Sequence, residues 1–209
     1  WTVGSDAVST STADNPNALG TRPSWVHAVV SPNTYRGNMT AGQYIGTVLD
    51  KLSALDASGE ELAGFICEPI YGNAGGIPLP TGYLKRVYQE IRSRGGLCIA
   101  DEVQVGYGRT GHHFWGFEQQ QVVPDVITIA KGMGNGHPLG AVITRKEIAD
   151  ALEKEGYFFS SAGGSPVSSV VGNTVLDIME DEQLQANACK VGDHLKERLE
   201  GLKQQHPLI

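Results

Sequence analysis

Apolar residues along the chain alternate between short continuous runs and helical spacing, which predicts a succession of strands and helices. The runs LAGFIC, LCIA and DVITIA are rich in Ile, Val and Leu, as expected for buried strands at 62–67, 97–100 and 125–130. WVHAVV at 25–30 predicts an earlier strand, and LGAVIT at 139–144 predicts a later one. The segment before WVHAVV is rich in Ser, Thr, Asn, Asp and Gly and predicts a loop.

Apolar residues three and four positions apart predict the helices. An amphipathic helix is expected over 41–56, and another over 84–91 that the basic and glycine residues of RSRGG end. A short helix begins over 147–152, and the proline at the start of 166–179 opens a longer one. Over 184–202 the apolar residues form a narrow seam. Because this seam lasts under three heptads, we interpret it as one helix packed against the domain.

The order of these elements predicts an α/β fold. Strands that alternate with helices at this rhythm form right-handed βαβ units and a mainly parallel sheet. In open α/β sheets, ligands bind outside the carboxyl ends of the strands. Two of the predicted strands lead directly to a polar residue, Asp101 after LCIA and Lys131 after DVITIA. We therefore expect Asp101 and Lys131 to face one bound molecule.

An acid and a lysine placed in this way suit one cofactor chemistry. A lysine amine forms a Schiff base with an aldehyde, and pyridoxal 5′-phosphate (PLP) is the usual aldehyde cofactor. A carboxylate beside the pyridine nitrogen keeps that nitrogen protonated, so that the ring accepts electrons from a substrate carbanion. Lys131 fits the first role and Asp101 the second. Taken singly, the acid also fits a turn cap and the lysine a solvated surface residue.

The flanking sequence carries a more specific signal. DEVQVGYGRTG, PDVITIAKGMGNGHPLGA, FICEPIYGNAGGIPLPTGYL and SSAGGSPV together resemble the class-III aminotransferases, which are PLP enzymes of fold type I. VQVGYGR, HFWGFE and MGNGHP are similar to the branch that holds ethanolamine-phosphate phospho-lyase and alanine–glyoxylate-type aminotransferases. The resemblance implies a three-layer sandwich, with a PLP-binding large domain over 1–166 and a helical linker and small-domain start over 167–209. It also implies that the chain is the middle of a longer enzyme, with the N-terminal part of the large domain missing.

The resemblance assigns roles to five residues of the expected PLP site. Lys131 holds the cofactor and moves the substrate proton, and Asp101 binds the ring nitrogen. Val103 packs on one face of the ring, pointing to the same side as Asp101 if the strand continues. Gln104 hydrogen-bonds the ring hydroxyl oxygen. Ser161 binds the phosphate of the partner subunit's cofactor, although the family usually carries threonine there; serine keeps the hydroxyl.

Three more residues bear on the substrate. Glu68 follows a predicted strand on the ligand side of the sheet. Asn73 stands where aminotransferases for ornithine and 4-aminobutyrate carry a glutamate that pairs with a movable arginine, which argues against those substrates. Arg109 suits either an anion contact or a structural salt bridge, and the sequence leaves both open.

The composition of the chain argues against several classes of binding partner. The 209 residues carry a net charge of −7, with no basic footprint for nucleic acid or an anionic membrane. The chain contains no apolar run long enough to span a membrane. Its three cysteines are widely spaced, which predicts neither a disulfide framework nor a metal site and fits a reducing cytoplasm. The adjacent His112 and His113 point oppositely on an extended chain and suit a shared metal poorly, and His137 is expected to be structural.

The sequence therefore predicts a PLP-dependent transaminase. It would move an amino group between a small-molecule amine or amino acid and a keto acid, as a homodimer with shared active sites. One alternative is a PLP-dependent phospho-lyase that acts on a phosphorylated amino alcohol. Another is a catalytically incomplete fragment that serves only as a folded or dimerising module.

Overall fold

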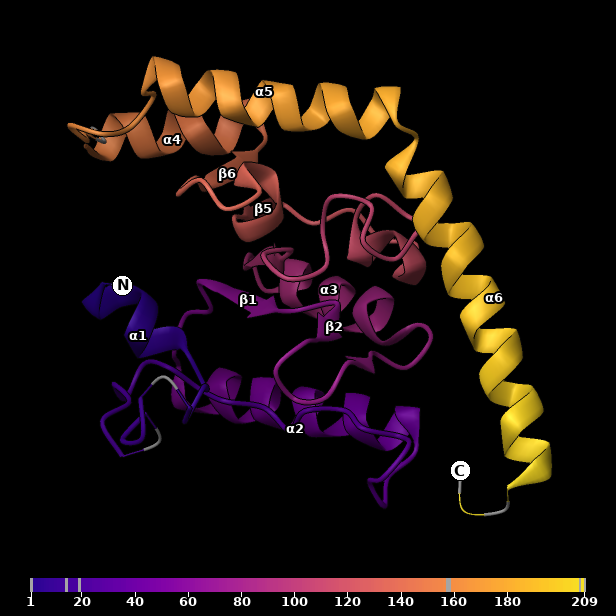
Figure 1. Ribbon diagram of the computed structural model, residues 1–209. Helices are drawn as coiled ribbons and strands as arrows, with labels where there is room; N and C mark the ends of the chain where they lie inside the picture. The colour runs from indigo at the N-terminus through magenta and orange to yellow at the C-terminus, as the bar shows by residue number, and fades with distance from the viewer. Residues whose placement is uncertain (1, 14, 19, 157–158, 207, 209) are drawn as a thin grey trace.

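The computed structural model describes residues 2–206 and 208, except 14, 19, 157 and 158. A four-stranded sheet lies between helix α2 on one side and helices α4 and α5 on the other (Figure 1). Its strand order is β1-β4-β5-β6, with bounds Gly64–Cys67, Leu97–Asp101, Val126–Ile129 and Ala141–Thr144. The first three strands are parallel, and β6 pairs with β5 in the antiparallel sense. The predicted α/β fold with a mainly parallel sheet is confirmed.

One βαβ unit forms the centre of the fold. Strand β1 leads through helix α3 (Tyr83–Ser93) to β4, which pairs with β1 in parallel register from Gly64 opposite Leu97. Between β1 and α3 the glycine-rich loop forms a small hairpin of β2 (Ile70–Tyr71) and β3 (Ile77–Pro78). This loop therefore contains no helix, as its glycines and prolines predict.

Helices α2 (Ala41–Ser58) and α3 pack together to form the main core. Thr40 opens α2 with a capping box to Gln43, and Gly59 ends it in the left-handed conformation that glycine adopts without strain. Each buried aliphatic or aromatic side chain contributes about 1.5–3 kcal/mol. The buried cluster consists of Tyr44, Val48, Leu52, Leu55, Leu79, Tyr83, Leu84, Val87, Tyr88, Ile91, Cys98, Ala100 and Phe117.

In the first turn of α3, a free backbone N–H group donates a hydrogen bond to a residue far away in the sequence. Its N-cap residue is Gly82, which has no side chain to bond the free backbone N–H groups. The buried Gln120, at the end of the 3₁₀ helix η1 (Gly116–Gln120), accepts a hydrogen bond from Leu84 N at 3.3 Å. Its Nε2 donates to Leu79 O at 3.2 Å. The segment after β4 is thereby fixed against the core.

Asp125 connects the sheet to two arginines. It is buried, and its carboxylate accepts hydrogen bonds from Cys98 N at 2.9 Å, Arg92 Nε at 3.1 Å and Arg145 Nη2 at 3.2 Å. Burial alone raises the pKa of Asp125, but the Cys98 N–H and the two guanidinium groups outweigh it and hold the pKa below its ordinary value. Asp125 therefore remains ionised and helps to hold β5 beside β4.

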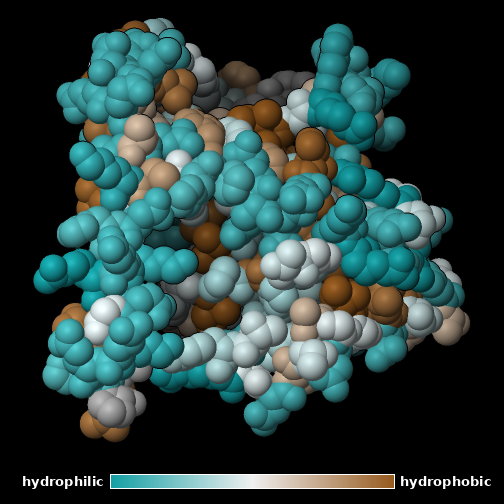
Figure 2. Space-filling view, turned by 90° about the vertical axis from the view of Figure 1, so that its right-hand side faces the viewer, coloured by the Kyte–Doolittle hydropathy of each residue, from teal (hydrophilic) through white to brown (hydrophobic). Residues whose placement is uncertain are grey.

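Three helices follow the sheet: α4 (Lys146–Glu155), α5 (Pro166–Asp181) and α6 (Leu184–Gln205). Helix α5 contacts the short 3₁₀ helix η2 (Lys131–Gly134), and α6 continues from its end along one side of the molecule (Figure 1). Helix α6 contains no buried residue in the part of the chain that the structure describes. Leu195 and Leu199 of its apolar seam remain 56% and 48% exposed, and Figure 2, which faces this side, shows apolar atoms among the polar surface. Helix α6 does lie against the domain, through Gln185 and Cys189 at the loop after β4, but its apolar seam is not the face that packs.

Two predictions for the N-terminal region are also wrong. WVHAVV forms no strand, and Trp25 and Val30 remain 63% and 50% exposed, because this segment pairs with no strand of the described sheet. The expected loop before it contains a helix, α1 (Val3–Val8), which a capping box between Thr2 and Ser5 stabilises locally. None of the helices in the described part of the chain is long and apolar enough to cross a membrane.

Candidate active site

The ends of three neighbouring strands bring the predicted polar residues to one edge of the sheet. Asp101 is the last residue of β4 and pairs with Thr128 of β5, and Lys131 follows β5 after a single residue. Glu68 follows the end of β1, the other neighbour of β4. Because these strands are parallel, all three side chains belong to the carboxyl edge, where ligands of α/β sheets bind.

Gln104 holds the Lys131 amine. Lys131 Nζ donates a hydrogen bond to Gln104 Oε1 at 2.7 Å. On its other side Gln104 lies against Gly72, where a Cβ atom would come within 2.5 Å of Gln104 Cγ. The hairpin loop after β1 therefore sets the position of Gln104, and Gln104 sets the direction of the lysine.

The Lys131 backbone adopts an uncommon conformation. Its φ angle is +42°, in the left-handed region that residues with a Cβ adopt at a cost. The surrounding turn maintains this conformation: Met133 N donates to Ala130 O at 3.1 Å, and Asn135 N donates to Gly132 O at 3.2 Å. Such backbone strain is concentrated at functional sites.

The carboxylate of Asp101 is held by the turn that follows it. Val103 N donates to Asp101 Oδ1 at 3.0 Å, whereas Oδ2 accepts no hydrogen bond within the described ranges. Strand β4 ends at Asp101 and a turn begins at Val103, so the condition under which Val103 would point to the same side as Asp101, a strand that continues, is not met. Val103 nevertheless lines a small cavity of about 70 Å³ together with Gln104 and Lys131.

Electrostatic coupling places Glu68 with the same group. Burial raises the pKa of the Glu68 carboxyl, although Gly72 N donates to it at 3.1 Å. The Asp101 carboxylate adds to this rise in pKa, and the Lys131 ammonium opposes it. Glu68, Asp101 and Lys131 therefore form one interacting set at the sheet edge.

A second cavity opens on the other side of the lysine. It has a volume of about 470 Å³ and is lined by Arg109, Lys131 and the loop over 132 and 135–139. Arg109 is exposed and forms no ion pair with any described residue, so its alternative as a structural salt bridge is wrong. In the loop, His137 Nε2 is joined to Ser168 Oγ of α5 by a hydrogen bond of 2.9 Å, which is a structural contact.

Two predicted residues form no hydrogen bond with this group in the part of the chain that the structure describes. Asn73 is exposed at the tip of the hairpin loop, with no hydrogen bond to the described residues. Ser161 is exposed in a tight turn in which the Ser160 hydroxyl accepts hydrogen bonds from Ala162 N and Gly163 N. Within the described residues, neither Asn73 nor Ser161 shares a hydrogen bond or a lined cavity with Lys131.

Comparison with known proteins decides the family. The sequence model described as "Aminotransferase class-III" matches residues 2–209. The chain belongs to the class-III aminotransferases. It is 48% identical over 185 residues to Alanine--glyoxylate aminotransferase 2 homolog 2, mitochondrial, from Arabidopsis thaliana, covering 88% of this chain and 38% of that protein. It is 43% identical over 198 residues to Alanine--glyoxylate aminotransferase 2-like from Drosophila melanogaster, covering 90% of this chain and 40% of that protein.

Comparison with solved structures supports the same family assignment. A phospholyase from Arthrobacter in complex with phosphoethanolamine matches with a TM-score of 0.83 and 34% identity, covering 94% of this chain and 49% of that chain. A Bacillus anthracis aminotransferase matches with a TM-score of 0.86 and 30% identity, covering 100% of this chain and 48% of that chain. The class-III aminotransferase chain thus spans about half the length of the chains in these structures and a smaller share of the length of the curated relatives.

The residues at the sheet edge fit the cofactor of the family. Class-III aminotransferases are PLP enzymes. The Lys131 amine is exposed and directed by Gln104, and Asp101 has a carboxylate oxygen that is not used by the described protein groups. One amine and one free carboxylate oxygen at neighbouring strand ends are the groups that a pyridine aldehyde requires.

The sequence did not reveal one residue that supports this site. Glu102 is 2% exposed, and its carboxylate accepts hydrogen bonds from Gly116 N at 2.8 Å and Phe117 N at 2.9 Å. Burial raises the pKa of Glu102, and the two N–H donors oppose the rise. Glu102 thus fixes the turn that carries Gln104. Alternation along β4 was the available signal, since the residue after Asp101 must point to the opposite side.

Proposed function

We propose that this class-III aminotransferase chain carries the reactive core of a PLP-dependent transaminase, which moves an amino group between an amine or amino acid and a keto acid. The supporting observation is the placement of Lys131 and Asp101 at adjacent parallel strand ends, with Gln104 bonded to the lysine. When bound, PLP supplies an electron sink for negative charge on the substrate carbon.

Each protein group then has a separate task. Lys131 Nζ, in its unprotonated form, would take the proton from the substrate carbon and deliver it to a different atom rather than back to that carbon, and Gln104 Oε1 keeps the amine directed towards the site. Asp101 Oδ2 is placed to keep a proton on the ring nitrogen, while Val103 N fixes the other oxygen. Arg109, which forms no ion pair with any described residue, lies beside the larger cavity and would bind an anionic group of the substrate.

The family resemblance extends the proposal to a homodimer with shared sites. Ser161 is exposed and lines neither of the described cavities beside Lys131, which fits its expected role at the phosphate of the partner subunit's cofactor. Asn73 stands on the substrate side and lacks the charge to pair with an arginine. The large domain would cover 1–166, and 167–209 would lead into the small domain. The wide spacing of Cys67, Cys98 and Cys189 in the sequence favours a cytoplasmic location, whereas similar proteins carry "mitochondrial" in their names.

Covalent trapping tests the cofactor site directly. The chain is incubated with PLP, reduced with borohydride and digested, and the modified peptide is located by mass spectrometry. We expect the pyridoxyl group on Lys131 and its loss in Lys131→Ala, with labelling retained in Lys85→Ala, which removes an exposed lysine of α3. Labelling spread over surface lysines, unchanged in Lys131→Ala, would show that the chain is only a folded or dimerising module.

Phospho-lyase chemistry is the second candidate, and the match to the phosphoethanolamine-bound Arthrobacter phospholyase favours it. The two reactions use the same lysine and carboxylate and differ in whether the substrate carbanion is reprotonated or expels phosphate. The experiment supplies phosphoethanolamine and PLP without a keto acid. Phosphate release that continues over many turnovers under these conditions would identify a phospho-lyase. Amino transfer that begins only when a keto acid is added would identify a transaminase.

A further inference from the structure

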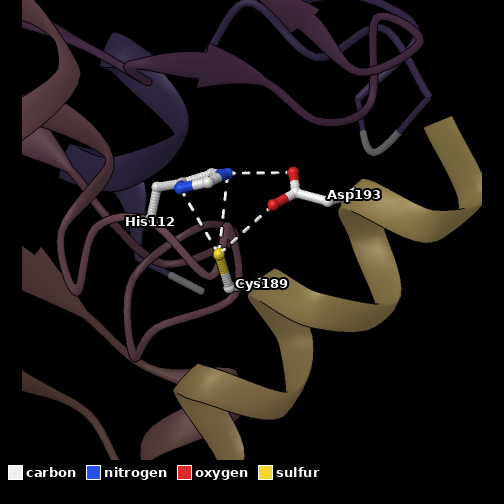
Figure 3. Close-up of side chains that lie close together, drawn as sticks. All are labelled: His112, Cys189 and Asp193. Atoms are coloured by element: carbon white, nitrogen blue, oxygen red, sulfur yellow. Dashed lines mark hydrogen bonds and ion pairs between the residues drawn. The ribbon is translucent and has the colours of Figure 1, made fainter. Parts of the chain in front are cut away.

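Three side chains that can bind a metal meet outside the proposed active site. His112 lies in the loop after β4, and Cys189 and Asp193 lie one turn apart on the same face of α6 (Figure 3). The ligand atoms of the three residues all lie within 4.8 Å of one another. The sequence predicted no metal site because His112 and Cys189 are 77 positions apart and no short motif joins them.

The distances within this cluster match the edges of a zinc coordination tetrahedron. Zinc–sulfur bonds of about 2.3 Å and zinc–nitrogen or zinc–oxygen bonds of about 2.0–2.2 Å place neighbouring ligand atoms about 3.3–3.6 Å apart. Cys189 Sγ lies 3.4 Å from His112 Nδ1 and 3.7 Å from His112 Nε2, and it lies 3.6 Å from Asp193 Oδ2, while the other carboxylate oxygen, Oδ1, lies 3.1 Å from His112 Nε2. Because the sulfur lies at similar distances from both ring nitrogens, metal binding requires the exposed imidazole to rotate until the lone pair of one nitrogen faces the ion.

The backbone around the cluster is seated firmly on α6. Gly111 lies against the helix so closely that a Cβ atom there would be 2.4 Å from Cys189 N. Its carbonyl oxygen accepts a hydrogen bond from Gln185 Nε2 at 3.0 Å. The position of His112 beside Cys189 is therefore set by backbone packing as well as by the side chains.

A nucleophilic triad is a poorer interpretation of the same residues. The Cys189 thiol donates to Asp193 Oδ2, and partial desolvation together with the Asp193 carboxylate raises its pKa. Nucleophilic cysteines require a lowered pKa, because the thiolate is the reactive form.

We propose that His112, Cys189 and Asp193 bind one Zn²⁺ ion. The ion forms bonds to Sγ, Nε2 and a carboxylate oxygen, the thiol proton leaves to solvent, and water fills the fourth position. Thiolate and imidazole ligands select zinc over magnesium or calcium. The site joins the loop that carries Arg109 to the first half of α6, so its role is to fix this loop.

Zinc titration against a chromophoric chelator tests the site in the metal-free chain without PLP. We expect one Zn²⁺ per chain, with affinity at least about tenfold weaker in Cys189→Ser and Asp193→Asn, since even an outer partner of a metal site is worth about 10–100-fold. The control is His194→Ala, which removes an exposed histidine next to Asp193. Its zinc affinity should equal that of the unmodified chain.

Cobalt supplies a second readout. Co²⁺ in the site should give a thiolate charge-transfer absorption that Cys189→Ser abolishes and His194→Ala leaves unchanged. Circular dichroism checks that the variants are folded. We expect them to be folded because all the substituted side chains lie at the surface or are half-buried. Unchanged zinc affinity in Cys189→Ser and Asp193→Asn, or the absence of stoichiometric zinc in the unmodified chain, would overturn the proposal.

Discussion

Among the described residues, the direction of the Lys131 amine is set by one neutral hydrogen-bond acceptor. Gln104 Oε1 accepts from Lys131 Nζ at 2.7 Å, and replacing Gln104 by leucine removes that acceptor at similar volume. A misdirected reacting group can cost up to about 10²-fold in rate. We therefore expect Gln104→Leu to slow the covalent capture of PLP at Lys131 by about 10–100-fold, followed by absorbance and borohydride trapping. Gln89→Leu, which makes the same change at an exposed glutamine of α3, is the control, and equal slowing in both variants would contradict a positioning role.

Asp125 predicts a pH-dependent contribution to stability. Its folded pKa lies below the ordinary value of about 3.9, so its stabilisation is complete above pH 4 and is lost as the pH falls through the folded pKa. Asp125→Asn removes the charge that faces Arg92 and Arg145 and should cost about 1–3 kcal/mol at pH 7.

Urea unfolding at several pH values measures the contribution of Asp125. The difference between the unmodified chain and Asp125→Asn should shrink below pH 4, where the native carboxyl gains its proton. A difference that stays constant from pH 7 to pH 3 would mean that the charge of Asp125 contributes nothing.

At the residue scale the sequence predicts the residues that take part in the reaction better than the buried residues that hold the site in place. Asp101 and Lys131 were found because each stands at the end of an apolar run, and strand ends determine position in an α/β sheet. Glu102 and Asp125 were not found, because a buried acid is recognised only by its partners. Those partners, such as Gly116 for Glu102 and Cys98 for Asp125, come from other elements and have no fixed spacing in the sequence.

At the element scale, the approach of α6 to the loop after β4 depends on glycine. Gly111 has φ +75° and leaves no room for a Cβ atom against the Cys189 backbone, whereas Gly59 at the end of α2 has φ +72° and open space around it. Alanine in a left-handed conformation costs about 1–2 kcal/mol. We expect Gly59→Ala to lose about that much stability and Gly111→Ala to lose more.

Hydrogen exchange distinguishes the two glycine variants further. In Gly111→Ala the first turns of α6, around Gln185 and Cys189, should lose protection because the loop is pushed away from the helix. Gly59→Ala should leave α6 unchanged. Equal protection of α6 in both variants would show that the loop and the helix are not coupled through this contact.

The elements that the sequence predicts well are those whose pattern matches their burial. Helices α2 and α3 have one apolar face that meets the core, so their spacing identified them. WVHAVV has the composition of a strand but lacks a neighbouring strand, and strand formation requires a partner. The seam of α6 has a helical pattern that identified the helix correctly, but the pattern does not reveal what the seam contacts, and in this chain it remains exposed.

At the scale of the whole molecule, the parallel strands and the exposed loops divide the expected site. The carboxyl edge of β1, β4 and β5 holds Lys131, Asp101 and Glu68, while Ser161 is presented on the surface before α5. This division fits a site completed by a second copy of the chain. The sequence predicted the division only through the family resemblance, since no pattern within one chain specifies the contacts of a dimer.

Mixed dimers test this shared site. Lys131→Ala alone should lose covalent capture, and Ser161→Ala alone should bind PLP more weakly, because a hydroxyl bond to phosphate is worth about 1.5–3 kcal/mol, or roughly 10–100-fold. In a dimer of one Lys131→Ala chain and one Ser161→Ala chain, one site contains neither substitution and should bind PLP with full affinity. Co-expression with two affinity tags isolates this mixed dimer, and PLP titration measures its strong sites. One strong site per mixed dimer supports sharing, whereas uniformly weak binding, or a chain that stays monomeric, contradicts it.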